Sequence, residues 1–155
     1  MIRRADADDL PVWAKMLASL HYDVSAEEWT AELEVLTKLR KPYVGFLSLT
    51  DEGEPIGMID ARERNYAEGA PHLRAAYVED LWVEPAHRRQ GVAAMLLRMV
   101  EEWAKGEEFD WLGSDAVIGN CESHEWHRSM GFAETERLVV FGKRLARLEC
   151  TSTHG

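Results

Sequence analysis

One stretch of the chain limits its fold more than any other, and it reads "WVEPAHRRQGVAAMLL" from Trp82 to Leu97. Apolar residues of strand character lead into Pro85, then two arginines and Gly91 follow, and an apolar run at helical spacing comes next. This order predicts a strand, a tight loop and a helix that begins at about Gly91. Such a connection is typical of α/β folds, in which helices pack on a sheet.

Hydrophobic periodicity and turn residues predict the other elements. Helix starts are marked by Asp6 or Asp8 and by a capping box of Ser25 and Glu28, and Pro42 is expected to end the second helix. The expected strands cover 1–5, 43–50, 55–65, 69–85, 109–115 and 135–145, and the expected helices cover 6–22, 25–41, 89–106 and 121–131. The apolar stripe of the third helix consists of Val92, Met95, Leu96, Met99, Val100 and Trp103.

This order of elements predicts an α/β fold, a mixed sheet with helices packed on it. A chain of 155 residues has the usual size of one domain, which we expect over 1–146. Residues 147–155 lose all periodicity and are expected to be a frayed C-terminal tail.

The net charge of −10 narrows the choice of partners. It argues against nucleic acid, whose phosphates need a basic face, and it favours a cationic ligand if carboxylates line a cleft. An acidic surface that keeps the protein soluble explains the same charge. Cys121 and Cys150 form no disulfide framework and have no metal-ligand spacing, so no metal is expected. Neither a signal peptide nor a membrane-spanning run is evident, which favours a cytoplasmic protein without a membrane partner.

The opening loop has the properties of an anion site. The first backbone N–H groups of the helix at Gly91 lack intrahelical partners, and the helix dipole adds partial positive charge. Gly91 allows close approach of a ligand to the backbone, Ala93 keeps the next turn narrow, and Arg88 and Arg89 add charge. The loop therefore fits a pyrophosphate, although it is neither a Walker A loop nor a G-x-G-x-x-G motif. Taken alone, it is equally compatible with a plain strand-to-helix turn with solvated arginines.

With "LWVEP" before the loop, and Gly119–Asn120 and "MGF" after it, the chain from about 60 to 144 resembles the GNAT acetyltransferase superfamily. The resemblance implies a mixed central sheet flanked by helices, with splayed strands that form an acetyl-CoA cleft. It also implies acetyl transfer from acetyl-CoA to an amine, without a metal. The cofactor-binding residues that it implies are Leu81, Trp82, Val83, Arg88, Arg89, Gln90, Gly91, Val92, Ala93, Ala94 and Asn120.

Within the superfamily, "YVEDLWVEPAHRRQGVA", "WLGSDAVIGN", "HRSMGFAETERLVVFGKR" and the upstream "ARERNYAEG" resemble the aminoglycoside 6′-N-acetyltransferases. This implies a homodimer that acetylates the 6′-amine of cationic aminoglycosides, a reaction of antibiotic resistance. Asp115 matches the carboxylate near the attacking amine. The other implied substrate-side residues are Tyr66, Glu79 and Glu136, together with His21 and Tyr22 where the relatives carry Trp-Pro.

The chemistry requires that the acceptor ammonium lose a proton and that an oxyanion be stabilised. Asp115 and Glu79 are the expected catalytic carboxylates, which bind and orient the ammonium and accept its proton, Glu79 through water. An oxyanion donor is expected from a backbone N–H at about Trp82 or Val83. The last helix has no tyrosine to protonate the thiolate, so His127, a water or unassisted departure stay open.

Other interpretations of the same residues stay open. By strand alternation, one of Glu79 and Asp80 faces inward or into a cleft. Asp115 is also compatible with a turn cap, Glu136 with an exposed strand residue and Tyr66 with packing. The alternative functions are acetylation of another small cationic amine, such as a polyamine or a peptide N-terminus, and a non-catalytic module that binds acetyl-CoA or the aminoglycoside.

Overall fold

The computed structural model describes residues 1–71 and 74–146, so the predicted tail over 147–155 lies outside the described residues. Its centre is a five-stranded sheet in the order β1-β2-β3-β4-β5. The strands are β1 (Ile2–Arg4), β2 (Tyr43–Leu49), β3 (Pro55–Arg64), β4 (Ala75–Val83) and β5 (Leu112–Gly113). The first four pair antiparallel in succession, whereas β4 and β5 are parallel, which confirms the mixed sheet.

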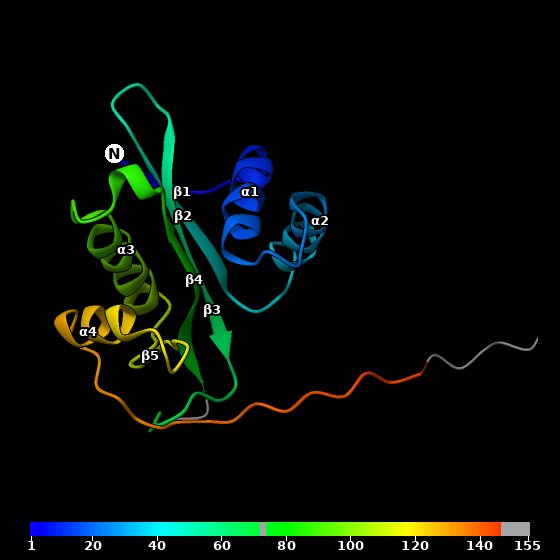
Figure 1. Ribbon diagram of the computed structural model, residues 1–155, viewed down its shortest axis with the longest axis vertical. Coiled ribbons are helices and arrows are strands. Elements are labelled where there is room, and N and C mark those ends of the chain that lie inside the picture. Colours follow the sequence, from blue (N-terminus) through cyan, green and yellow to red (C-terminus); the bar gives the residue numbers. More distant parts are fainter. Residues whose placement is uncertain (72–73, 147–155) are drawn as a thin grey trace, which may run out of the picture.

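Helices cover both faces of this sheet (Figure 1). α1 (Leu10–Leu20) and α2 (Ala26–Leu36) lie on one face, α3 (Val92–Gly106) lies on the other, and α4 (Cys121–Ser129) lies beside β5. Two apolar clusters hold these layers together. The cluster on the α3 face includes Val44, Ile59, Val78, Leu96 and Val100, and the cluster on the α1 face includes Trp13, Leu17, Leu47 and Met58.

The predicted helix starts agree with the structure. Asp6 caps the short 3-10 turn that leads into α1, and the Ser25–Glu28 capping box is formed at α2. Among the described residues, no helix has the length and apolar character needed to cross a membrane.

A β-bulge in the β3–β4 pair controls which way two carboxylates face. Asp60 pairs with Asp80, but the next residue of β3, Ala61, pairs with Val78, so Glu79 is the extra residue. Val78 and Leu81 both pack in the α3-side cluster although they are three residues apart. Glu79 and Asp80 between them therefore both turn toward the α1 face, so simple alternation fails here.

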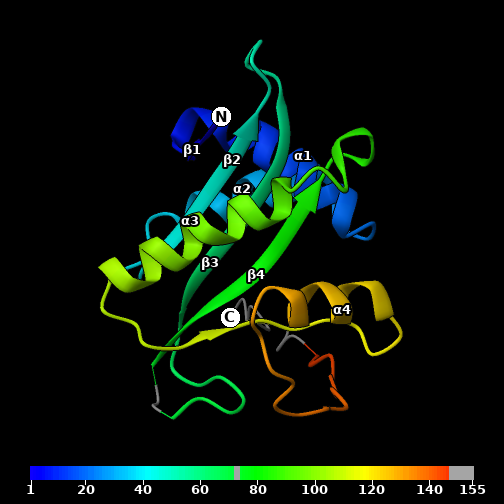
Figure 2. The ribbon, with the colours of Figure 1, turned by 90° about the vertical axis from the view of Figure 1, so that its left-hand side faces the viewer.

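The sheet opens between β4 and β5. These strands pair only at Ala76–Leu112 and Tyr77–Gly113, while β4 continues to Val83. Beyond Gly113 the chain diverges from β4 toward α4 (Figure 2). The strands are thus splayed, as the resemblance to the acetyltransferases implies.

Three predicted elements differ from the structure. The second helix ends at Leu36 instead of 41, and the strand expected over 109–115 is reduced to Leu112–Gly113. The final strand expected over 135–145 is not formed. A strand needs a partner edge for its backbone hydrogen bonds, and after Phe132 the described chain runs away from the sheet (Figure 1). The apolar side chains of this segment are exposed: Leu138, Val139, Val140, Phe141 and Leu145.

Candidate functional site

The loop before α3 has the backbone of an anion cradle. Gly91 is the N-cap of α3 with φ of 81°, and Arg89 also has a positive φ, of 63°. Left-handed backbone at a non-glycine residue is uncommon and is often found at functional sites. No described atom lies within 4 Å of the position that a Cβ on Gly91 would take, so the approach to the first N–H groups of α3 is open. This geometry fits the pyrophosphate of acetyl-CoA.

The side chains of the cradle differ in their contacts. Arg88 Nε donates to the Val83 carbonyl at 2.8 Å, and its guanidinium lies 4.8 Å from the centre of the Trp82 ring. Arg88 therefore braces the loop against the end of β4. Gln90 Nε2 donates to the Ala86 carbonyl within the loop, and the exposed Arg89 side chain lies 3.3 Å from Glu122. Both arginines are exposed, but the Arg89 side chain, 85% exposed, is the one that does not brace the loop.

An unpaired strand edge of β4 runs from the opening of the sheet to the cradle. In the β4–β5 pairing, the β4 edge at Leu81, Trp82 and Val83 has no partner residues. The backbone groups of this edge that point away from β3 are available to an extended ligand, as the predicted pairing with the pantetheine arm requires, apart from the Val83 carbonyl, which accepts from Arg88. Asn120 caps α4, because its Oδ1 accepts a hydrogen bond from the Ser123 backbone N–H at 3.1 Å. Val92, Ala93 and Ala94 form the first turn of α3.

Glu79 lies on the α1 face with two arginines of β3. Arg62 Nε donates to its Oε1 at 2.8 Å, and Arg64 donates to both carboxylate oxygens, at 2.7 and 2.6 Å. Burial alone raises the pKa of Glu79, but the hydrogen bonds and charges of Arg64 and Arg62 outweigh it and hold the pKa below its ordinary value. Glu79 is therefore an ionised anchor in this arrangement.

Asp115 is joined to the same cluster through Tyr77. The Tyr77 hydroxyl donates to Asp115 Oδ2 at 3.0 Å, and the Arg64 guanidinium lies 3.6 Å from the centre of the Tyr77 ring. Burial raises the pKa of Tyr77, as do the charge and hydrogen bond of Asp115, so its hydroxyl stays a donor. The structure thus brings the two predicted catalytic carboxylates, Asp115 and Glu79, to one site.

Beside them lies a buried chain of polar groups that runs through Asp60 and Asp80. His21 Nε2 lies 2.6 Å from Asp80 Oδ1, the Asp80 backbone N–H donates to Asp60 Oδ1 at 2.9 Å, and the Tyr43 hydroxyl donates to Asp60 Oδ2 at 2.7 Å. Burial raises the pKa of Tyr43 far above its ordinary value, and the Asp60 charge adds to this. Of these residues, sequence reasoning selected only His21 as a site residue. The period-two spacing of Asp60, Arg62 and Arg64 in β3 was an available signal for the shared face.

The remaining predicted substrate-side residues are exposed. Tyr22 follows α1 and is 92% exposed, and Tyr66 lies in the loop between β3 and β4. Glu136 lies in the segment after α4. The preceding Thr135 is packed so close to Gly69 that a Cβ there would lie 2.5 Å from it, so the Glu136 segment passes the loop that carries Tyr66.

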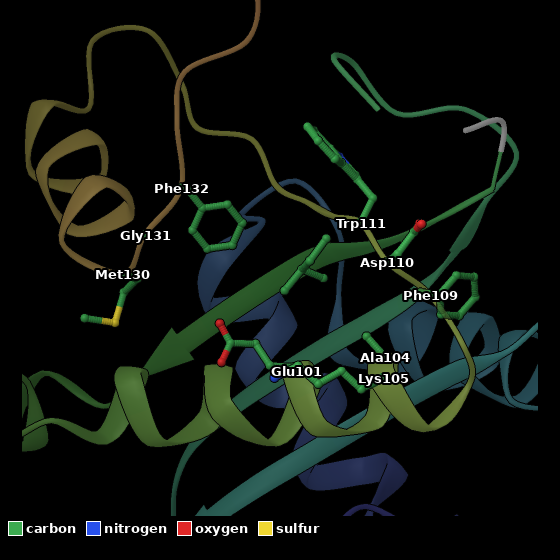
Figure 3. Close-up of a pocket in the computed structure, with 10 residues that line it drawn as sticks. Glu101, Ala104, Lys105, Phe109, Asp110, Trp111, Met130, Gly131 and Phe132 are labelled. Carbon is green, nitrogen blue, oxygen red and sulfur yellow. The ribbon is translucent and has the colours of Figure 1, made fainter. Parts of the chain in front are cut away.

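A pocket of about 340 Å³ lies away from this site, between the C-terminal half of α3, β5 and the turn after α4. Figure 3 shows Met130 and Phe132 on one side of it, Glu101 and Lys105 of α3 below, and Trp111 above. On the nearby α4, His127 Nδ1 lies 2.7 Å from the Ser123 carbonyl and its Nε2 lies 2.8 Å from the Ser114 hydroxyl. In the part of the chain that the structure describes, no group of three or more metal-ligating side chains is gathered.

Known proteins are similar in sequence to this chain over nearly its whole length. The sequence profile of the acetyltransferase (GNAT) family matches residues 10–132. The aminoglycoside N(6′)-acetyltransferase type 1 of Acinetobacter haemolyticus is 35% identical over 145 residues, which cover 93% of this chain and 98% of that protein. The protein of the same description from Serratia marcescens is 33% identical over 147 residues, with 94% and 99% covered.

Solved structures share the fold. The apo crystal structure of the aminoglycoside 6′-N-acetyltransferase of Acinetobacter haemolyticus superposes with a TM-score of 0.81, at 33% identity, and covers 94% of this chain and 99% of that one. The structure of AAC(6′)-Iy in complex with a bisubstrate analogue, CoA-S-monomethyl-acetylneamine, gives a TM-score of 0.86 at 27% identity, with 94% and 98% covered. The chain therefore belongs to the GNAT family of acetyltransferases and, within it, to the group of aminoglycoside N(6′)-acetyltransferases.

Proposed function

We propose that this protein transfers the acetyl group of acetyl-CoA to the 6′-amine of aminoglycoside antibiotics, by direct attack of the amine on the thioester in a ternary complex. The observation that carries this proposal is the position of the acidic cluster of Glu79, Asp80 and Asp115, which lies beside the splay of β4 and β5, while the anion cradle follows the C-terminal end of β4. An anionic cofactor and a cationic acceptor thus have adjacent sites of opposite character.

The cofactor site is assigned to β4 and to the start of α3. The N–H groups of the first turn of α3, reached past Gly91, hold the pyrophosphate, and Arg89 supplies a solvent-facing charge. Arg88 and Gln90 stabilise the conformation of the loop through their hydrogen bonds to backbone carbonyls. Asn120, at the start of α4, lies on the CoA side. The pantetheine arm pairs with the backbone of Leu81, Trp82 and Val83, where a backbone N–H also stabilises the oxyanion.

The acceptor site is assigned to the α1 face. Asp115 binds and orients the acceptor ammonium, since its carboxylate is fixed by Tyr77 but exposed to the opening. Glu79 contacts the same amine through water. His21, Tyr22, Tyr66 and Glu136 surround the rest of the aminoglycoside. The attack forms a C–N bond and breaks the C–S bond. The nitrogen releases its remaining surplus proton to water as the tetrahedral intermediate collapses, and CoA leaves as the thiolate, with His127 or a water as its proton source.

An acceptor panel tests the activity. Kanamycin-type aminoglycosides with a 6′-amine are expected to stimulate thiol release from acetyl-CoA, because the amine is the nucleophile. A 6′-hydroxyl analogue serves as the matched control and is expected to be inert at that carbon. The measurement is thiol release with a chromogenic disulfide, followed by mass spectrometry of the product. The absence of stimulation by every aminoglycoside, or equal release with polyamines, argues against this substrate.

We propose further that the protein acts in the cytoplasm as a homodimer. The support for the dimer is the unformed strand over 135–145. Its exposed apolar side chains have no cover in the described chain, and the outer edge of β5 lies beside the pocket of Figure 3. A strand from a second copy covers both the open edge and the exposed side chains, because it pairs with the β5 edge and buries its apolar side chains there.

A double substitution in this segment tests the dimer. Val140→Asp with Phe141→Asp places two charges in the buried contact, so the protein is expected to shift from dimer to monomer in size-exclusion chromatography with light scattering. Val35→Asp, at an exposed apolar position of α2, is the control and is expected to stay dimeric. A wild-type mass of one chain, about 17.7 kDa, contradicts the proposal.

A further inference from the structure

Asp60 and Asp80 are carboxylates on the α1 face that the proposed mechanism does not use. Asp60 is 2% exposed, and both of its oxygens are engaged, one by the Tyr43 hydroxyl and one by the Asp80 backbone N–H. Burial and the neighbouring Asp80 charge raise the pKa of Asp60 well above its ordinary value. Asp60 therefore has no route to solvent, and its contact with the bulge fixes the backbone from which Asp80 projects.

Asp80, in contrast, is connected to solvent by an imidazole. His21 is the C-cap residue of α1, held by a hydrogen bond from its backbone N–H to the Leu17 carbonyl at 2.8 Å, and its ring lies 5.2 Å from the Trp29 ring of α2. The side chain of Asp80 is 13% exposed and that of His21 is 40% exposed. The 2.6 Å contact between them thus joins a largely buried carboxylate to the protein surface.

The other carboxylates of the site are less suited to accept a proton. Glu79 receives three hydrogen bonds from Arg62 and Arg64, which stabilise its ionised form. Asp115 is exposed and is held by the Tyr77 hydroxyl. Burial raises the pKa of Asp80 against the opposing effect of His21, and a general base works best when its pKa approaches the working pH. Asp80 therefore differs from Glu79 in that its pKa is raised instead of lowered, and it is the carboxylate that contacts an imidazole open to solvent.

We propose that Asp80 and His21 form the proton outlet of the acceptor site, an inference that rests on the proposed function. The acceptor ammonium, held by Asp115, gives its proton to the Asp80 carboxylate, and the freed nitrogen lone pair attacks the thioester carbonyl. Asp80 passes the proton from Oδ1 to His21 Nε2, in the tautomer that carries its hydrogen on Nδ1. The imidazolium then releases the Nδ1 proton to water, which leaves the Nε2–H tautomer beside the ionised Asp80. Exchange of the ring protons with water restores the Nδ1–H tautomer before the next turnover. His21 acts through Asp80 and is a positioning residue in this scheme.

Substitution of His21 by glutamine tests the outlet, because glutamine keeps a hydrogen bond to Asp80 but carries no proton onward. For His21→Gln we expect kcat with a 6′-amino aminoglycoside to fall about tenfold at about pH 7, and by less than about twofold at about pH 9, where more of the acceptor is already neutral. Asp80→Asn is expected to show the same pH pattern with a larger loss. The acetyl-CoA dissociation constant, measured by calorimetry, is expected to stay unchanged in both variants.

His124→Gln is the control, since it removes a half-buried imidazole of α4 whose contact is the Val117 carbonyl, and it is expected to follow the wild type at every pH. A loss that is equal at all pH values indicates a purely structural role and overturns the outlet, as does an unimpaired His21→Gln enzyme. Both outcomes presuppose an active wild type. A wild type without turnover on any aminoglycoside overturns the proposed function, and the outlet with it.

Discussion

Replacement of Asp115 by alanine is expected to lower kcat about 100-fold, because the acceptor amine loses the carboxylate that binds and orients it, and misplacement by about 1 Å is enough for such a loss. Acetyl-CoA binding is expected to be unchanged, since the cradle lies at the other end of β4. The measurements are steady-state kinetics with a 6′-amino aminoglycoside and calorimetry with acetyl-CoA. Tyr77→Phe is expected to give a smaller loss, because it frees the Asp115 carboxylate without removing it.

Asp51→Ala is the matched control for the change in net charge, since Asp51 is an exposed carboxylate in the turn between β2 and β3. It is expected to retain wild-type kcat. Turnover by Asp115→Ala at the wild-type rate removes Asp115 from the mechanism. A parallel loss of acetyl-CoA affinity indicates instead that the loop after β5 supports the cofactor site.

Local sequence rules predicted the elements whose hydrogen bonds and packing are local. The cap residue Asp6 and the Ser25–Glu28 box form as expected, and Gly91 begins α3 as its N-cap. The α3 stripe was predicted less well, because Met95 is 45% exposed whereas Leu97, outside the predicted stripe, is buried. The sequence of an amphipathic helix does not show how far the sheet extends beneath it, so it does not fix which residues at the border of the apolar face are buried.

The final strand could not be predicted from its own residues. "TERLVVFGKRL" has strand composition, but a strand is formed by pairing with another edge, and the described chain offers no pairing to this segment. The same composition also predicts an apolar surface, and an exposed surface of this kind is typical of an interaction site. The failed prediction is therefore the observation that supports the proposed dimer.

The bulge in β4 explains why the sequence did not show that Glu79 and Asp80 share one face of the sheet. The resemblance selected Glu79 and Asp115, which lie in one cluster in the structure, but alternation assigned an inward position to only one of Glu79 and Asp80. The register shift at Asp60 turns both toward α1, where Asp80 meets His21. A bulge is set by pairing across strands, so it leaves no signal in a single strand's period.

Replacement of Gly91 by valine is expected to weaken acetyl-CoA binding about 100-fold, because loss of one or two charge-assisted hydrogen bonds, each worth about 1.5–3 kcal/mol, has an effect of this size. Gly91 has φ of 81°, which a β-branched residue adopts only with strain, so the first N–H groups of α3 are displaced. A valine side chain also occupies the open space through which the pyrophosphate reaches them. Calorimetric titration with acetyl-CoA and CoA measures the effect.

Gly53→Val separates the effect of backbone strain from the effect of a side chain in the path of the pyrophosphate. Gly53 has φ of 87° and, like Gly91, no described atom within 4 Å of an added Cβ, but it lies in the turn between β2 and β3. Backbone strain is thus matched, while the ligand path is absent. We expect both variants to lose similar thermal stability and only Gly91→Val to lose cofactor affinity. An equal effect on acetyl-CoA binding indicates that strain alone acts through the fold, whereas unchanged binding in Gly91→Val places the pyrophosphate elsewhere.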